Sequence, residues 1–157
     1  NTRSRGLGDV YKRQDVGCLK QLKDIHSKTN SSVLGVFSAP DSELKNYGVI
    51  DATQENDMLK LNSIIEKPSI NVAPSNLAVF GRYILSKSIF NILEETQPGL
   101  NGEIQLTDAI RSFLSNDSVF AFEFQGRRFD CGSKEGYVSA IVDRASHLEN
   151  FREIVKK

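Results

Sequence analysis

Several residue types and patterns are scarce or missing in this sequence. Its 157 residues include no tryptophan, one methionine, two cysteines and four prolines. No apolar run approaches the ~18 residues of a membrane-spanning helix, and no apolar signal-peptide core is visible. Cys18 and Cys131 lie far apart and match no metal-ligand spacing. These absences favour reduced thiols in a cytoplasmic protein without a membrane partner.

A dominant charge is also absent. Lysine plus arginine number 20, aspartate plus glutamate number 20, and the formal net charge is +0. The chain therefore has no overall field that would attract nucleic acid or an acidic membrane surface. Its hydrophobic content of 39% and charged content of 25% are typical of soluble globular proteins. The length suits one domain, which can bury roughly 70% of its unfolded surface.

Residues 1–14 fit poorly with the sequence that follows. They are basic, contain glycine and show no clear period. We expect them to be a non-native leader, such as translated adapter sequence, and residues 15–157 to be the protein domain. A short native strand or tail is the alternative. If the leader is foreign, any motif that belongs upstream of Asp15 has been lost.

The rest of the chain alternates between helical and extended patterns, which predicts an α/β fold with a mixed central sheet and flanking helices. Strands are expected at 32–37, 47–51, 58–66, 77–85, 118–124 and 127–130. Helices are expected at 16–28 with Asp15 as cap, after Ser86, from about Leu106 to Leu114, and after Ser133. The first two helices would bury Cys18, Leu19, Leu22 and Ile25, and Ile89, Phe90, Ile92 and Leu93. Residues 47–66 form a predicted hairpin that turns at Asn56-Asp57.

The hairpin ends on Glu66 and Lys67, where Pro68 stops the strand. In open α/β sheets, ligands bind outside the carboxyl ends of strands. A carboxylate can accept from two hydroxyls and an ammonium can neutralise a phosphate, so the pair suits a ligand with hydroxyls at one end and phosphate at the other. An exposed ion pair without function is the alternative, and it is the commoner fate of a Glu-Lys dipeptide.

Two further acidic positions are candidates for chemistry. Asp108 lies near the start of the helix that follows Gly102-Glu103, where it could hold Mg²⁺ or only favour the helix dipole. Asp130 begins an Asp-Cys-Gly-Ser sequence between a strand and a helix, where it could orient a basic or hydroxyl group. A tight turn capped by Ser133 is the simpler interpretation of that segment.

Taken together, four blocks resemble the C-terminal half of bacterial UTP–glucose-1-phosphate uridylyltransferases, within the wider family of sugar nucleotidyltransferases. The blocks are Tyr-Gly-Val-Ile-Asp at 47–51, Ile-Glu-Lys-Pro at 65–68 with Pro-Ser-Asn-Leu-Ala-Val-Phe-Gly-Arg-Tyr at 74–83, Gly-Glu-Ile-Gln-Leu-Thr-Asp-Ala-Ile at 102–110, and Phe-Asp-Cys-Gly-Ser-Lys at 129–134. Each block is weak alone. Their order and spacing extend the resemblance over about residues 16–148.

The resemblance implies the C-terminal part of a Rossmann-like nucleotidyltransferase fold, truncated at the N-terminus. It implies a parent enzyme that makes UDP-glucose and pyrophosphate from UTP and glucose 1-phosphate, with Mg²⁺ as cofactor, in a cytoplasmic homo-oligomer. Glu66 matches the family position that holds glucose hydroxyls, and Lys67 the catalytic position that grips the sugar phosphate. Gly48 matches a backbone contact to the sugar, and Val79 a wall of its pocket. Asp108 matches a position near the metal, which it would reach directly or through water.

The family's glycine-rich nucleotide loop and its metal-binding strand-end aspartate find no match in this chain. We therefore expect the 157 residues alone to be inactive. Two alternatives remain open: a related enzyme that uses dTTP, and a non-catalytic module for sugar-phosphate binding or assembly. For assembly, the apolar residues near the C-terminus, Leu148, Phe151, Ile154 and Val155, could form the interface.

Overall fold

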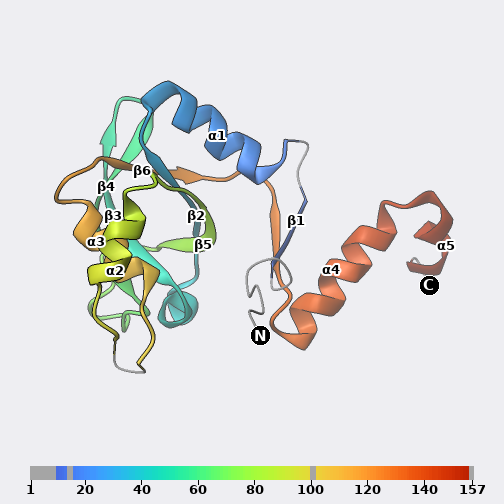
Figure 1. The fold of residues 1–157 in the computed structure, drawn as a ribbon. Helices are drawn as coiled ribbons and strands as arrows, with labels where there is room; N and C mark the ends of the chain where they lie inside the picture. The colour runs from blue at the N-terminus through green and yellow to red at the C-terminus, as the bar shows by residue number, and fades with distance from the viewer. Residues whose placement is uncertain (1–9, 14–15, 100–101, 156–157) are drawn as a thin grey trace. The chain divides into compact units, whose positions relative to one another are not determined.

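The computed structural model describes residues 10–13, 16–99 and 102–155 (Figure 1). The chain divides into two compact units. One is continuous, from Cys18 to Phe124. The other combines Asn1–Gly17 with Gln125–Lys157.

The continuous unit is built on five strands whose order is β2-β5-β3-β4-β6, and β6 pairs back with β2 to close the sheet. They are β2 (Ser32–Ser38), β3 (Gly48–Glu55), β4 (Met58–Glu66), β5 (Leu77–Ile84) and β6 (Val119–Glu123). The β2–β6 pair is parallel and the other pairs are antiparallel, so the expected mixed sheet is confirmed. The predicted hairpin is confirmed as well, with Asn56 at a positive φ of 55° in its turn.

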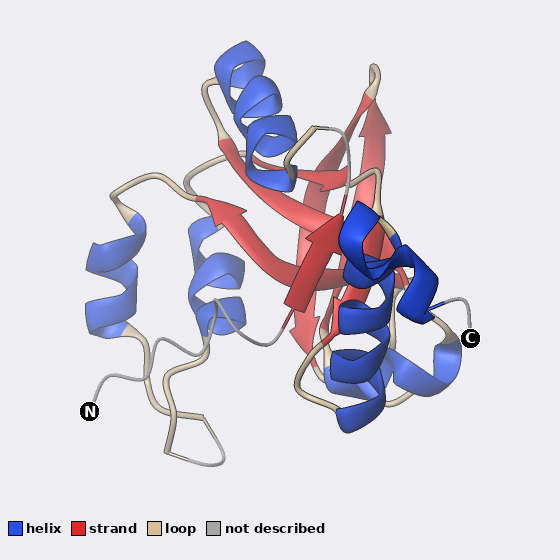
Figure 2. Ribbon diagram, turned by 90° about the vertical axis from the view of Figure 1, so that its right-hand side faces the viewer, coloured by secondary structure: helices blue, strands red, loops and turns tan. Residues whose placement is uncertain are grey.

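Three α-helices of this unit lie outside the strands, which Figure 2 draws in red. They are α1 (Cys18–Thr29), α2 (Ile89–Glu95) and α3 (Leu106–Phe113), and a 3₁₀ helix, η1, covers Asp41–Asn46. Helices α2 and α3 pack on each other, and α3 also packs on β4. Ala109, Ile110 and Phe113 of α3 share one buried cluster with Ile64 of β4, as the periodicity of α3 predicts. Helix α1 packs on a separate cluster through Cys18 and Leu22.

Two expected core residues are exposed. Leu19 is 58% exposed and Phe90 is 65% exposed, so the prediction that they are buried is wrong. Each lies about 100° around its helix from the preceding residue, Cys18 or Ile89, which points into the core. The buried stripe of each helix is therefore narrower than the sequence suggested. Ser86 is not the residue directly before α2, since the helix begins after Ser88.

Strand β6 is buried on both faces rather than half-buried. Its Val119 and Ala121 contribute to one cluster, while Phe122 packs with Phe124 against the other. The strand pairs with β2 at one edge and with β4 at the other. Its first three residues are buried, whereas Glu123 at its end is exposed.

The second unit contains β1 (Val10–Arg13), β7 (Arg127–Asp130), α4 (Lys134–Ser146), a 3₁₀ turn η2 (Glu149–Phe151) and α5 (Arg152–Val155). Strands β1 and β7 pair in antiparallel fashion. Residues 10–13 therefore form a short strand, as the alternative interpretation of residues 1–14 expects. That residues 1–14 are a non-native leader stays a prediction. The cap expected from Asp15 falls outside the described residues. The Ser133 cap is confirmed, because its side chain accepts from the Gly136 N–H.

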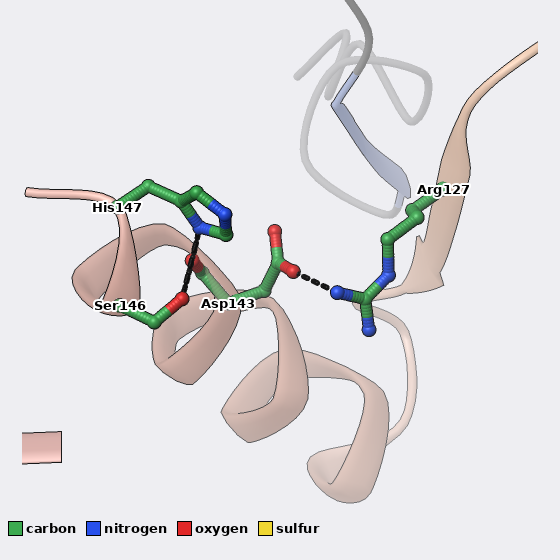
Figure 3. A network of polar contacts seen from close by, with 4 residues as sticks. All are labelled: Arg127, Asp143, Ser146 and His147. Carbon is green, nitrogen blue, oxygen red and sulfur yellow. Dashed lines mark hydrogen bonds and ion pairs between the residues drawn. The ribbon is translucent and has the colours of Figure 1, made fainter. Parts of the chain in front are cut away.

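A buried carboxylate joins α4 to β7 inside this second unit (Figure 3). Asp143 points from the helix toward the guanidinium of Arg127 and pairs with it, and the Asp143 side chain is only 3% exposed. Arg127 also lies over the Phe129 ring, 5.2 Å from its centroid. At the helix end, His147 Nδ1 lies 2.9 Å from the Ser146 hydroxyl. No helix within the described residues is long and apolar enough to cross a bilayer.

Candidate functional site

Three of the predicted site residues lie in one row across adjacent strands. Gly48 on β3 pairs with Glu66 on β4. On the other side of β3, Val49 pairs with Ala78 of β5, so Gly48 falls next to Val79. Directly opposed residues of antiparallel strands present their side chains on the same face. The register therefore brings Glu66, Gly48 and Val79 together on one side of the sheet.

The side-chain position at Gly48 is a gap in this row, and neighbouring side chains already press into it. A Cβ built there would lie 2.9 Å from Thr107 Cγ2 and 3.3 Å from Glu66 Oε2. The first separation is closer than real Cβ atoms approach, and the second would displace the carboxylate. Only a glycine therefore fits beside Glu66 without displacing its neighbours. The backbone of Gly48 keeps the regular pairing of β3 with β4, opposite Glu66.

We expect Gly48→Ala to weaken sugar-phosphate binding and to destabilise the fold. The added methyl group would meet the buried Thr107 methyl first and the Glu66 carboxylate next, so the stability loss should be about 1–3 kcal/mol. The dissociation constant for glucose 1-phosphate and the unfolding free energy are the two measurements. Gly17→Ala is a matched control, because a Cβ there meets nothing within 4 Å. Unchanged affinity in Gly48→Ala would contradict the role of the gap.

Lys67 has an unusual backbone conformation. Its φ is +46°, and its N–H donates to the Tyr47 carbonyl at 3.0 Å. The left-handed region costs an L-residue about 1–2 kcal/mol, and a following proline restricts Lys67 further. Its ammonium lies 3.9 Å from Glu66 Oε1 and its side chain is 61% exposed, against 27% for Glu66. The ion pair is therefore loose, and the ammonium remains accessible to an anion.

Tyr83, on β5, has a buried phenol that is sensitive to Glu66. Burial raises the pKa of Tyr83 to about 12, and the negative charge of Glu66 adds to the rise. Tyr83 packs against the same apolar cluster as Val79. Both observations place Tyr83 on the side of the sheet where the candidate site lies.

The raised pKa of Tyr83 predicts a loss of stability in alkaline solution. Between the ordinary pKa of about 10 and the folded value of about 12, the unfolded phenol ionises while the folded one keeps its proton. This contribution is complete below the unfolded pKa and is lost as the pH rises through the folded one. Tyr83→Phe should therefore lose less unfolding free energy than wild type between about pH 8 and about pH 11. Denaturant titrations at both pH values measure the difference, and equal losses would refute the assignment.

Residues of the matching blocks also have structural roles. Val79 lies in the row, but it is only 5% exposed and belongs to the apolar cluster with Ile64, so its side chain is also part of the core. Ser75 donates to the Ile50 carbonyl at 2.6 Å and accepts from the Leu77 N–H. The Pro-Ser-Asn part of its block thus fastens the start of β5 to β3.

Asp108 pairs with a residue of its own helix and does not belong to the row. Its carboxylate accepts from Arg111 at 2.8 Å, three residues further along α3. It lines an open pocket of about 460 Å³ between α2 and α3, and the lining includes neither Glu66 nor Lys67. Among the described residues, no group of three or more His, Cys, Asp or Glu side chains could hold a metal ion. The described side chains therefore do not fit a complete magnesium site, and a metal role for Asp108 stays a prediction.

The second acidic candidate, Asp130, takes part in a local turn. Its Oδ1 accepts from the Gly132 N–H at 3.0 Å, and its carbonyl accepts from the Ser133 hydroxyl at 3.1 Å. Neither Cys18, which is buried, nor Cys131, which is partly exposed, forms a disulfide within the described residues. Their reduced state in the cell stays a prediction.

Thr107 is not among the predicted site residues, yet its methyl group lies against the gap at Gly48. Helical spacing puts Thr107 on the same face as Ile110, three residues later, and this is the signal that could identify it. The apolar pattern of the helix does not include a threonine. The side chain is 7% exposed.

Comparison with known proteins shows the family to which this chain belongs. A family model described as Nucleotidyl transferase matches residues 8–147. The chain belongs to the nucleotidyl transferase family. The expected fold is confirmed by the structure of a UTP-bound UGPase from Acinetobacter baumannii, which aligns with 94% of this chain at a TM-score of 0.80 and 34% identity. A UDP-glucose pyrophosphorylase complexed with UDP-glucose aligns with 85% of the chain at a TM-score of 0.76 and 37% identity.

Two curated relatives in this nucleotidyl transferase family are named UTP–glucose-1-phosphate uridylyltransferase. The relative from Staphylococcus epidermidis is 43% identical over 140 residues, which make up 88% of this chain and 49% of the relative. The relative from Bacillus subtilis is 41% identical over 148 residues, or 94% of this chain and 51% of the relative. The resemblance expected from the four blocks is confirmed. The chain spans about half the length of the curated relatives it matches.

Proposed function

We propose that this chain forms the sugar-phosphate-binding part of a UTP–glucose-1-phosphate uridylyltransferase, which makes UDP-glucose and pyrophosphate. The observation that carries the proposal is the row Glu66–Gly48–Val79 with Lys67 at its end, on a chain 43% identical to an enzyme of that name. The row offers a carboxylate, a gap and an apolar neighbour side by side. An exposed ammonium lies next to the carboxylate.

Each side chain has a task in this reaction. Glu66 accepts hydrogen bonds from sugar hydroxyls, and the absence of a side chain at Gly48 leaves the Glu66 carboxylate in place for them. Lys67 neutralises the phosphate of glucose 1-phosphate and orients its oxygen. That oxygen attacks the α-phosphorus of UTP in line, a P–O bond forms, and pyrophosphate leaves with the electrons of the bond that breaks. Positioning and charge neutralisation can supply most of the catalysis without a covalent enzyme intermediate.

Mg²⁺ belongs to the proposal as the cofactor that would neutralise charge on the nucleotide phosphates. Asp108 is the candidate neighbour of the ion in this chain, directly or through water. Its pairing with Arg111 favours contact through water. The contribution proposed for this chain is to bind and orient the sugar phosphate.

A hybrid enzyme tests the proposal. This chain would replace the matching 140 residues of the Staphylococcus epidermidis relative. We expect the hybrid to release pyrophosphate from UTP plus glucose 1-phosphate in the presence of Mg²⁺, and the 157-residue chain alone to release none. An inactive hybrid that folds, beside an active unmodified relative, would overturn the proposal. Robust turnover by the chain alone would refute the prediction that this chain holds only the sugar-phosphate-binding part of the site.

The nucleotide and the assembly state are proposals of the same kind. UTP is favoured over dTTP because the relatives at 41–43% identity carry the uridylyl name. A panel of nucleotides on the hybrid tests this preference. A homo-oligomer is consistent with the exposed apolar side chains Phe151, at 47%, and Ile154, at 69%. A cytoplasmic location stays a prediction from the sequence. Light scattering of the hybrid with and without residues 146–157 would test their part in assembly.

A further inference from the structure

Thr107 carries a buried hydroxyl that nothing in the proposed function uses. It is the second residue of α3, and its side chain is 7% exposed. Its Oγ1 is closed off from solvent and has no hydrogen-bond partner. Leaving a buried hydroxyl unsatisfied costs about 1–3 kcal/mol. Such a cost calls for a compensating role.

The position of Thr107 suggests the role. Its methyl Cγ2 lies 2.9 Å from the point where a Cβ on Gly48 would be, and Glu66 Oε2 lies 3.3 Å from the same point. The threonine from α3 and the carboxylate from β4 therefore border one small gap. One of them has an unused donor, and the other is an acceptor.

The geometry also limits what the hydroxyl can reach. A ligand cannot contact Oγ1 in its present orientation, because the atom is inaccessible even to water. Rotation about the Cα–Cβ bond by about 120° can move the hydroxyl to the position that the methyl group now occupies, while the methyl group takes the position of the β-hydrogen, and threonine in helices populates two such rotamers. The rotation brings the hydroxyl to the side of Gly48, where the Glu66 carboxylate also lies. A hydroxyl that donates to a carboxylate there forms a charge-assisted hydrogen bond.

We propose that Thr107 is a positioning residue for Glu66. When sugar phosphate binds at Glu66, the Thr107 hydroxyl turns toward Gly48 and donates to the Glu66 carboxylate, which is then held in the orientation that accepts the sugar hydroxyls. This inference rests on the proposed function and adds to it a residue outside the Glu-Lys motif. Thr107 acts through Glu66, so its loss weakens sugar-phosphate binding and leaves UTP binding unchanged.

The test compares three variants of the hybrid enzyme. Thr107→Val keeps the shape and removes the hydroxyl, and Thr107→Ser keeps the hydroxyl. We expect the valine variant to bind glucose 1-phosphate roughly tenfold more weakly, as for loss of one hydrogen bond to a charged group, and the serine variant to restore most of the affinity. The KM for UTP should not change. In a Glu66→Ala background, Thr107→Val should have almost no further effect on the dissociation constant, which NMR titration can measure in the weak range.

The melting temperature of the full chain separates a positioning role from a structural one. Because the hydroxyl has no partner in the fold, Thr107→Val should not lower this temperature. An unchanged affinity in an active hybrid, or an equal loss with and without Glu66, would overturn the role of Thr107 and leave the proposed function standing. A wild-type hybrid without turnover would instead overturn the proposed function, and this inference with it.

Discussion

Lys67→Ala lowers kcat/KM of the hybrid enzyme for glucose 1-phosphate by roughly a hundredfold, as expected for loss of a charged hydrogen-bond donor to a phosphate. The ammonium is loosely paired with Glu66 at 3.9 Å and largely exposed, so it has little role in the fold. Its removal should therefore leave secondary structure intact. Pyrophosphate release at varied glucose 1-phosphate concentrations measures the change.

The control for this prediction is a lysine within β4, the strand that Lys67 directly follows. Lys60 pairs with Glu55 at 3.1 Å near the hairpin turn and is partly exposed, so Lys60→Ala removes the same charge without touching the row. Its kcat/KM should remain close to wild type. If Lys67→Ala turned over normally, or if both variants were equally impaired, the phosphate-binding role of Lys67 would be wrong.

The backbone of Lys67 allows a second comparison. Lys67→Gly removes the same side chain but tolerates the φ of +46°. It should be as inactive as Lys67→Ala and about 1 kcal/mol more stable, because alanine retains the cost of the left-handed conformation. Urea denaturation of the two variants decides the point. A glycine variant less stable than the alanine variant would show that the conformation is not strained.

Arg127→Gln lowers the free energy of unfolding by about 2 kcal/mol, because it removes a cationic partner from a buried carboxylate. Asp143 is 3% exposed, whereas Arg127 is 66% exposed. Solvent therefore reaches only the guanidinium, and for this reason we expect less than the full cost of breaking a buried pair. The lost contact with Phe129 adds to the effect. Guanidinium denaturation of the full chain measures the change.

The double variant Arg127→Gln/Asp143→Asn provides the control. Without the buried charge, the loss of its partner should matter little, and most of the lost stability should return. If the two substitutions were additive, Asp143 would not depend on Arg127. Since the pair lies in the second unit, neither variant should change the affinity of the row in the first unit for glucose 1-phosphate.

Local sequence patterns predicted most of the elements but few of the contacts. Strand β4 spans Met58–Glu66, with the predicted bounds, because a turn precedes it and Pro68 follows it. Leu19 shows the limit of such patterns. Periodicity identifies an apolar residue beside a helical stripe, and only the packing partner determines how wide that stripe is.

For the candidate site as well, local sequence predicts some of the residues but not which of them lie side by side. Glu66 and Lys67 could be selected from chemistry, since a strand that ends on opposite charges before a proline suits a phosphorylated, hydroxylated ligand. A glycine inside a strand indicates a bulge or a close backbone approach by a ligand, so Gly48 has a local signal, whereas Val79 is predicted only through family resemblance. Their adjacency to Glu66 depends on the register of three strands. No local sequence pattern in the chain predicts that strand register.

The sequence by itself determined the helices and strands, the mixed α/β character, the Glu-Lys pair and membership of the family, because all of these depend on residue types and their spacing along the chain. Only the tertiary structure decided that Glu66, Gly48 and Val79 form one row, that Thr107 borders the gap, and that Asp108 faces Arg111 instead. The physical reason is that strand register and helix packing are set by contacts between residues far apart in the chain. A change of register by one residue would turn these side chains to the other face of the sheet.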